Sequence, residues 1–289
     1  MYSFTEVFAL YPSVALISAT VLGLLVGSFL NVVIYRLPKM LQAGWREQCC
    51  ELLEQEPPEP KRFNLVTPNS TCPHCGHGIT PWENIPVLSY LVQRGKCTAC
   101  KGKISARYPT IELVTGLLSL FIIHRFGVTW EGGAALVLTW SLIALTVIDF
   151  DTQLLPDAIT LPLLWLGLIV NHLGGFVTLE DALWGAIAGY LSLWLIYWSF
   201  KLLTGKEGMG YGDFKLLGAL GAWLGWQMLP VVVLLSSFVG AAIGIGMMLI
   251  LGRDKNIPMP FGPYLAIAGW LAFIWGDQMV RQYLQFFAL

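Results

Sequence analysis

Long apolar runs recur along the whole chain and constrain its fold more than any other feature. Of its 289 residues, 56% are hydrophobic and only 12% are charged, whereas a soluble domain carries about a quarter charged residues. About 20 apolar residues in a helix cross the roughly 30 Å hydrocarbon core of a bilayer, and a helix satisfies its own backbone polar groups there. The sequence therefore predicts an all-α polytopic membrane protein. The net charge of −1 favours neither nucleic acid nor another strongly charged partner.

The distribution of apolar runs and of Lys and Arg predicts about eight transmembrane helices. The expected spans lie near residues 13–35, 109–124, 132–148, 158–170, 182–200, 214–226, 230–252 and 260–275. Ten of the 17 basic residues fall in the polar segment 36–107, and such enrichment is typical of cytoplasmic loops. Eight alternating crossings then leave both chain ends outside. They put Asp149, Asp151, Asp157 and Asp213 at the cytoplasmic face.

These boundaries divide the chain into three expected domains. Residues 1–35 form the first transmembrane helix, residues 36–107 a cytoplasmic zinc-binding domain, and residues 108–289 a seven-helix membrane domain. The middle segment has about 70 residues, a size at which a domain commonly needs a metal or a disulfide in addition to its core. We expect a bound metal to stabilise this domain.

The cysteines of this segment have the spacing of a zinc site. Cys72 and Cys75 form one CxxC pair, and Cys97 and Cys100 form a second pair after 21 intervening residues. Two such pairs supply four thiolates to one tetrahedral zinc ion, as in a zinc ribbon. A zinc ion with four cysteine ligands has no open position for water, so its role is structural. Two redox-active dithiols, or cysteines that only pack, are the alternatives.

The run Gly210-Tyr211-Gly212-Asp213 stands at the mouth of the sixth apolar run. A carboxylate beside hydrocarbon is costly to ionise and marks a functional site. The two glycines leave room for another backbone to approach Asp213 closely. An N-cap of the following helix is the alternative role for this residue. The nearby basic residues Lys206 and Lys215 favour a functional site at Asp213 over the N-cap role.

Asp149 closes the third apolar run. An anion at a helix C-terminus is opposed by the macrodipole, so Asp149 needs a partner, a proton or a function. Asp151 lies about 200° farther around a continuing helix, and the residues alone do not choose between the two. If Asp149 meets Asp213, the two carboxyl groups can share one proton, as aspartyl proteolysis requires. The helix ends then favour Asp213 as the initial base and Asp149 as the acid.

Two further acids have simpler alternatives. Glu112 stands at the start of the second run, where a first-turn carboxylate is favoured by the helix dipole; binding of substrate or methyl donor is the functional alternative. Asp157 follows Pro156 and is expected to cap the fourth helix.

Motifs along nearly the whole chain resemble one family, the type IV prepilin peptidases of the bifunctional kind. The resemblance rests on Gly27-Ser28-Phe29-Leu30-Asn31-Val32, Tyr35-Arg36, Asn69 to Cys75, Trp82-Glu83-Asn84-Ile85-Pro86, Arg107-Tyr108-Pro109, Ile148-Asp149, Leu155-Pro156-Asp157, Gly210-Tyr211-Gly212-Asp213-Phe214-Lys215 and Pro260-Phe261-Gly262-Pro263. It implies a bacterial inner-membrane enzyme, with its zinc domain and active site facing the cytoplasm. Such an enzyme removes the basic leader of type IV prepilins and type II secretion pseudopilins, then methylates the new N-terminus with S-adenosylmethionine.

The resemblance also assigns residues. The family's catalytic aspartates fall on Asp149 and Asp213, which favours Asp149 over Asp151. Its metal cysteines fall on Cys72, Cys75, Cys97 and Cys100, expected to hold one structural Zn²⁺. Gly95 and Lys96 match a region associated with methyl transfer, and with Glu112 they are the candidate methyl-donor residues. Membrane lipid is a further expected partner, nucleic acid is not, and the oligomeric state is left open.

Two other functions fit part of the sequence. A general GxGD intramembrane protease shares the paired aspartates but leaves the cysteine pairs unexplained. A transporter or assembly scaffold would use the carboxylates to carry protons and the zinc domain to recruit a partner.

Overall fold

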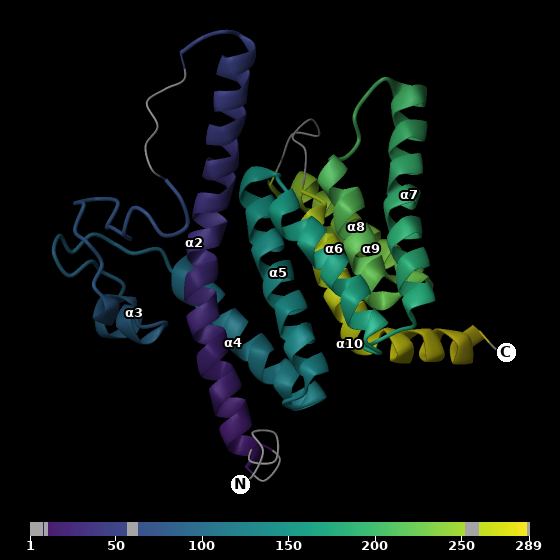
Figure 1. The fold of residues 1–289 in the computed structure, drawn as a ribbon, viewed down its shortest axis with the longest axis horizontal. Helices are drawn as coiled ribbons and strands as arrows, with labels where there is room; N and C mark the ends of the chain where they lie inside the picture. Colours follow the sequence, from purple (N-terminus) through teal and green to yellow (C-terminus); the bar gives the residue numbers. More distant parts are fainter. Residues whose placement is uncertain (1–7, 9–10, 57–62, 252–259, 288–289) are drawn as a thin grey trace. The chain divides into compact units, whose positions relative to one another are not determined.

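The computed structural model describes residue 8 and residues 11–56, 63–251 and 260–287. Within these residues every named element is a helix (Figure 1), which confirms the predicted all-α class. The long helices are α2 (Pro12–Leu52), α4 (Arg107–Phe126), α5 (Trp130–Thr152), α6 (Asp157–His172), α7 (Leu179–Thr204), α8 (Tyr211–Leu224), α9 (Leu229–Leu251) and α10 (Gly262–Phe287). Three short helices are η1 (Pro81–Asn84), α3 (Leu88–Val92) and η2 (Trp226–Met228). Each predicted apolar run overlaps one of the long helices, and residue 252, the end of the seventh run, lies outside the described residues.

Length and composition divide these helices. Among the described residues, five are long and apolar enough to cross a membrane: α2, α4, α5, α7 and the stretch Trp226–Leu249 formed by η2 and α9. The helix α6 is apolar but has only 16 residues, and α8 has only 14, fewer than the about 20 that span the hydrocarbon. The eight predicted spans thus correspond to eight long helices of the described residues, but only five meet the length and hydropathy of a full span, and α8 and α10 do not.

The chain forms two compact units, Met1–Trp140 and Ser141–Leu289. The first unit contains α2, α4 and the cysteine segment between them. The helix α2 does not end at residue 35, where the first span was expected to end, but continues to Leu52. The expected division at residues 35 and 36 thus falls inside a helix.

Glycines allow α2 and α4 to pack closely in the first unit. A Cβ added at Gly23 would lie 2.4 Å from Oγ of Ser119, and one at Gly27 would lie 2.7 Å from Cα of Glu112. Small residues at such positions let membrane helices approach through their backbones. Asn31, which is 8% exposed, donates from Nδ2 to the carbonyl of Tyr108 at 3.1 Å. This hydrogen bond fixes the position of the first turn of α4 along α2.

The short helix α8 is the core of the second unit (Figure 1), because α6 and α7 both hold it. At Gly185 on α7 an added Cβ would lie 2.2 Å from the carbonyl oxygen of Gly221 on α8. On the α6 side, Trp223 donates from Nε1 to the carbonyl of Leu163 at 2.8 Å. Asn171 donates from Nδ2 to the carbonyl of Ala222 at 2.8 Å. A buried helix fixed on two sides gives Asp213, in its first turn, a defined position.

Candidate functional site

Asp149 lies in the last turn of α5 and is only 5% exposed, whereas Asp151 is exposed. Its Oδ2 accepts a hydrogen bond of 3.0 Å from the backbone N–H of Gly262, the first residue of α10. An N–H at a helix N-terminus is a favourable donor to an anion. The unfavourable interaction of Asp149 with the dipole of α5 is therefore offset by a donor at the start of another helix, 113 residues away in sequence.

Asp213 is 6% exposed in the first turn of α8. The N-cap of that helix is Gly210, three residues earlier, so the N-cap role considered for Asp213 is wrong. Its Oδ2 instead accepts a hydrogen bond of 3.2 Å from the backbone N–H of Gly210. This is the reach-back bond that an acidic residue at the third helical position makes in a capping box.

The structure brings these two acids together. Their carboxyl groups are close enough to interact electrostatically. Leu155, in the connection from α5 to α6, packs against both sides of the site. An added Cβ at Gly212 would lie 2.7 Å from Cβ of Leu155, and one at Gly262 would lie 3.1 Å from its Cδ1. The space at Gly212 is thus filled by a leucine side chain, which corrects the expectation that another backbone approaches there.

An ion pair that sequence reasoning missed lies near this site. Both carboxylate oxygens of Asp157 accept from Nζ of Lys215 at 2.7 Å. Pro156 holds the N-cap position of α6, so the expected capping role of Asp157 is also wrong. The pair joins the start of α6 to α8 two residues after Asp213. The signal for it was two opposite charges, each near the start of a predicted apolar helix.

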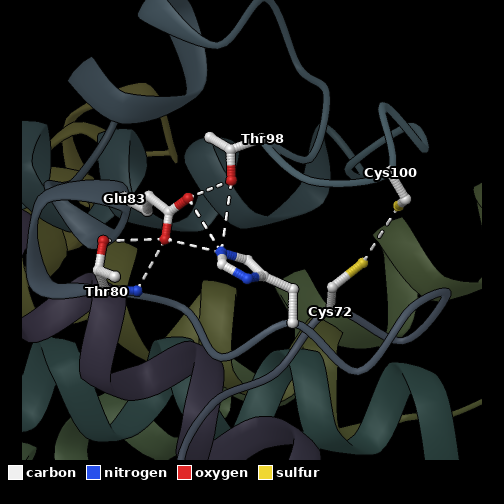
Figure 2. A network of polar contacts seen from close by, with 6 residues as sticks. Cys72, Thr80, Glu83, Thr98 and Cys100 are labelled. Carbon is white, nitrogen blue, oxygen red and sulfur yellow. Dashed lines mark hydrogen bonds and ion pairs between the residues drawn. The ribbon is translucent and has the colours of Figure 1, made fainter.

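The four cysteines of the CxxC pairs form one cluster, as predicted from their spacing. Their Sγ atoms all lie within 4.8 Å of one another, and those of Cys72 and Cys100 are 3.9 Å apart (Figure 2). Four sulfurs at about 2.3 Å from a tetrahedral zinc ion lie about 3.8 Å apart. Each pair sits in a hairpin closed by one bridge, Thr71 with Gly78 and Lys96 with Lys103. The donor set and its spacing fit a zinc ion.

The thiols of the cluster do not all favour the same charge. The backbone N–H groups of His74 and Cys75 lower the pKa of Cys72 to about 7. At Cys75 the N–H of His77 favours the thiolate, but loss of hydration and the neighbouring thiols outweigh it and raise the pKa to about 11. A cation that binds all four sulfurs must therefore displace protons from some of them.

Glu83 connects the two cysteine hairpins (Figure 2). Its carboxylate accepts from the hydroxyl of Thr98 in the second hairpin and contacts Nε2 of His77, which follows the first hairpin's cysteines, at 3.3 Å. It also accepts from the N–H and hydroxyl of Thr80, at 2.8 and 2.9 Å. These bonds, that of Thr98 first, lower the pKa of Glu83 to about 2. Sequence reasoning missed this role, although Glu83 lies in the motif Trp82-Glu83-Asn84-Ile85-Pro86.

A second residue missed from the sequence is Arg36. It is 7% exposed on α2. Its guanidinium donates to the carbonyls of Asn64 at 2.9 Å and of Pro68 at 2.7 Å. The segment that leads to the first cysteine hairpin is thereby fixed to α2.

The three candidate methyl-donor residues lie at the two ends of α3. Gly95 is buried in a turn with φ 66°, and an added Cβ would lie 2.9 Å from the ring of Tyr90. Lys96 next to it is exposed. At the other end, Glu112 is 8% exposed and its Oε2 accepts from the N–H of Val87 at 2.7 Å. Lys96 is therefore the one of the three whose side chain faces solvent.

Two family models match the chain. Residues 21–126 match the family model described as bacterial peptidase A24 N-terminal domain. Residues 136–245 match that of the type IV leader peptidase family. No solved structure matches the chain.

Three curated relatives carry the name prepilin leader peptidase/N-methyltransferase. The chain is 59% identical to the protein of Pseudomonas aeruginosa over 280 residues, which is 96% of each chain. It is 60% identical to that of Stutzerimonas stutzeri over 97% of this chain and 98% of the relative. It is 52% identical to that of Neisseria gonorrhoeae over 91% of each. Such identity over nearly full length means that the chain belongs to the prepilin leader peptidase/N-methyltransferase family, membrane enzymes with protease and methyltransferase activity in one chain.

Proposed function

We propose that Asp149 and Asp213 are the catalytic pair of the protease. The observation that carries this proposal is their convergence: two buried carboxyl groups from α5 and α8 interact beside the start of α10. Two acids so placed cannot both ionise easily, so one proton is shared between them. The substrates are type IV prepilins and type II secretion pseudopilins, whose basic leader is removed at the cytoplasmic face.

The chemistry follows from the protonation of the pair. The ionised carboxylate takes a proton from a water molecule, and that water attacks the carbonyl carbon of the scissile peptide bond. The neutral carboxyl group donates a hydrogen bond to the carbonyl oxygen, then gives its proton to the leaving nitrogen. The ends of α5 and α8 favour Asp213 as the base and Asp149 as the acid, whereas the N–H of Gly262 at the start of α10 also stabilises an ionised Asp149. The N–H groups of Gly210 and Gly262 orient the two carboxyl groups.

Methyl transfer is assigned to the first unit. S-Adenosylmethionine supplies an electrophilic methyl group to the uncharged amine of the new N-terminal residue, usually Phe. Gly95, Lys96 and Glu112 are the proposed methyl-donor residues. The exposed ammonium of Lys96 is suited to pair with a carboxylate, and the turn at Gly95 presents it.

The remaining roles concern metal and location. We assign Cys72, Cys75, Cys97 and Cys100 to one structural Zn²⁺, which holds the two hairpins together and takes no part in hydrolysis. The cytoplasmic zinc-binding domain of residues 36–107 and the seven-helix domain of residues 108–289 are the proposed functional parts. The proposed location is the bacterial inner membrane, with both sites facing the cytoplasm.

One reconstitution tests the function. Purified protein in lipid is given a prepilin and labelled S-adenosylmethionine, and both leader removal and methyl incorporation are measured. Asp149→Ala and Asp213→Ala are expected to abolish leader removal, while exposed Asp151→Ala retains it. Leader removal by either of the first two variants contradicts the proposed pair. A parallel assay with an already cleaved pilin separates methyl transfer from proteolysis, and both variants should still methylate it.

A further inference from the structure

The short helix α3 exposes an apolar surface in the segment between the two helices α2 and α4. Leu88, Leu91 and Val92 are 61%, 63% and 82% exposed, and Trp82 in the preceding turn is 81% exposed. Within α3, the apolar side chains of Leu88, Leu91 and Val92 are more exposed than those of Ser89 and Tyr90. We call these four side chains the α3 apolar surface. Exposed apolar side chains gathered in so short a stretch mark a contact with a partner or a membrane.

The position of α3 along α4 points to a membrane. The helix α4 has 20 residues, which at 1.5 Å per residue is about 30 Å, the thickness of the hydrocarbon core. If α4 crosses the membrane, nearly all of its residues therefore lie within the hydrocarbon core. Glu112 is the sixth residue of this helix, and it binds the N–H of Val87 at 2.7 Å, immediately before α3 begins. The start of α3 thus lies against the second turn of a spanning helix.

Contacts along α2 also place α3 near the level of the membrane. Asn31 is bonded to Tyr108, so these residues are at one level. Arg36 lies five residues farther along α2, about 7.5 Å toward the cytoplasm. There it binds the carbonyls of Asn64 and Pro68. The polar segment around residues 64–68 is therefore on the cytoplasmic side of α3, and α3 is closer to the bilayer than that segment is.

The attachment of α3 at this depth is specific. Val87 has φ 61°, a backbone conformation that β-branched residues rarely adopt. Such a conformation persists only where surrounding contacts hold it. Here Pro86 is buried, and the N–H of Val87 is bonded to the buried carboxyl group of Glu112. The neighbouring face of α4 is also apolar and open, with Leu113 and Leu117 at 47% and 53% exposed.

The charges around α3 complement an anionic membrane surface. Residues 81–107 contain five Lys and Arg residues but a single acidic residue, Glu83, which is bonded to Thr80 and Thr98. Arg94 and Lys96 directly follow α3 and are exposed. Basic side chains next to an apolar surface bind anionic phospholipid headgroups, while a Trp side chain favours the interface.

We propose that the α3 apolar surface is inserted into the cytoplasmic leaflet and anchors the cysteine domain to anionic phospholipid. The occupant is the bilayer that α4 itself crosses, so the surface is continuous with the lipid-facing side of that helix. The anchor holds Arg94, Gly95 and Lys96 at the headgroup level, where a cleaved substrate leaves the membrane. The inference concerns the membrane contact and holds whatever substrate the enzyme cleaves.

Quenching by lipid tests the insertion in the full-length, zinc-loaded protein. The background is Cys49→Ser with Cys50→Ser, and the environment-sensitive fluorophore NBD is attached after Leu91→Cys or Val92→Cys. The control is Leu52→Cys, a leucine that is 84% exposed at the far end of α2. In nanodiscs with anionic phosphatidylglycerol, spin-labelled lipid is expected to quench NBD at positions 91 and 92, with a blue-shifted emission. The label at position 52 should keep its intensity and its emission in water.

Two results of the quenching experiment overturn the proposal. One is equal and weak quenching at positions 91, 92 and 52. The other is a water-like label at position 91 that becomes shielded only when prepilin is added, because the surface then binds protein. Photoactivatable phospholipid applied to the unaltered protein provides a check without substitutions. Crosslinks located by mass spectrometry are expected in residues 82–92, and their absence there, when α4 is labelled, also contradicts insertion.

Discussion

The backbone N–H of Gly262 donates a 3.0 Å hydrogen bond to Oδ2 of Asp149, and no side chain larger than hydrogen fits between them. An added Cβ at Gly262 would lie 2.7 Å from that same oxygen. One residue therefore provides both the donor and the space for the carboxyl group. The motif Pro260-Phe261-Gly262-Pro263 acquires a physical role from this contact, because it starts a helix at the acid.

Gly262→Ala is expected to remove most protease activity while the protein still folds. The new methyl group displaces the carboxyl group of Asp149, and a misplacement of about 1 Å costs roughly 10²-fold in rate. Leader removal by the purified variant measures the effect. Gly246→Ala on α9, where an added Cβ meets nothing within 4 Å, is the matched control. A Gly262→Ala enzyme with the rate of the control would contradict the assigned geometry.

Gly27→Ala is expected to destabilise the first unit. Its Cβ would lie 2.7 Å from the backbone of Glu112, which a side-chain rotation cannot relieve. Overpacking of this kind costs about 1–3 kcal/mol. Gly44→Ala on the same helix meets nothing within 4 Å and should stabilise by up to about 1 kcal/mol through helix propensity. Unfolding in mixed detergent measures both, and equal signs for the two changes would refute the packing argument.

Cys72→Ser and Cys97→Ser are each expected to lose bound zinc, because a hydroxyl replaces one of four thiolates at the cluster. Metal content of the purified proteins, measured by mass spectrometry, gives the result. Cys49→Ser is the control, since Cys49 is exposed on α2 and outside the cluster. Wild-type zinc content in either of the first two variants would show that the cluster is not the metal site.

Glu83→Gln is expected to release zinc faster than the wild type at neutral pH. Folding lowers the pKa of Glu83 from 4.5 to about 2, so the carboxylate form stabilises the hairpins. That contribution is fully present above pH 4.5 and is lost as the pH falls through about 2. The difference in stability between variant and wild type should therefore be greatest at neutral pH and shrink below pH 4.5.

Zinc transfer to a chromophoric chelator measures the release rate of Glu83→Gln. Near-ultraviolet circular dichroism across the pH range follows the hairpins. Glu47→Gln, at an exposed position of α2, is the control. An equal release rate in all three proteins would mean that Glu83 does not hold the hairpins together.

Local patterns in the sequence were enough to predict the helices and the clustering of the four cysteines. Apolar runs predict where membrane helices form, because burial of each segment in lipid depends on its own composition. The CxxC spacing predicts the cluster of Cys72, Cys75, Cys97 and Cys100, because a CxxC hairpin brings its two sulfurs together locally. Asp213 was identifiable for a similar reason, since its glycines precede it directly.

Contacts between distant segments needed the folded chain. Asp149 and Asp151 carry the same side chain two residues apart, and only packing shows that Asp149 is buried against Gly262 while Asp151 is exposed. From the sequence alone, Glu83 and Arg36 were indistinguishable from solvated charges of a polar segment. The structure shows that both have hydrogen-bond partners. Hydropathy and spacing are local properties, readable residue by residue. The burial of Asp149 and its helix-end donor depend on groups that meet across tens of residues.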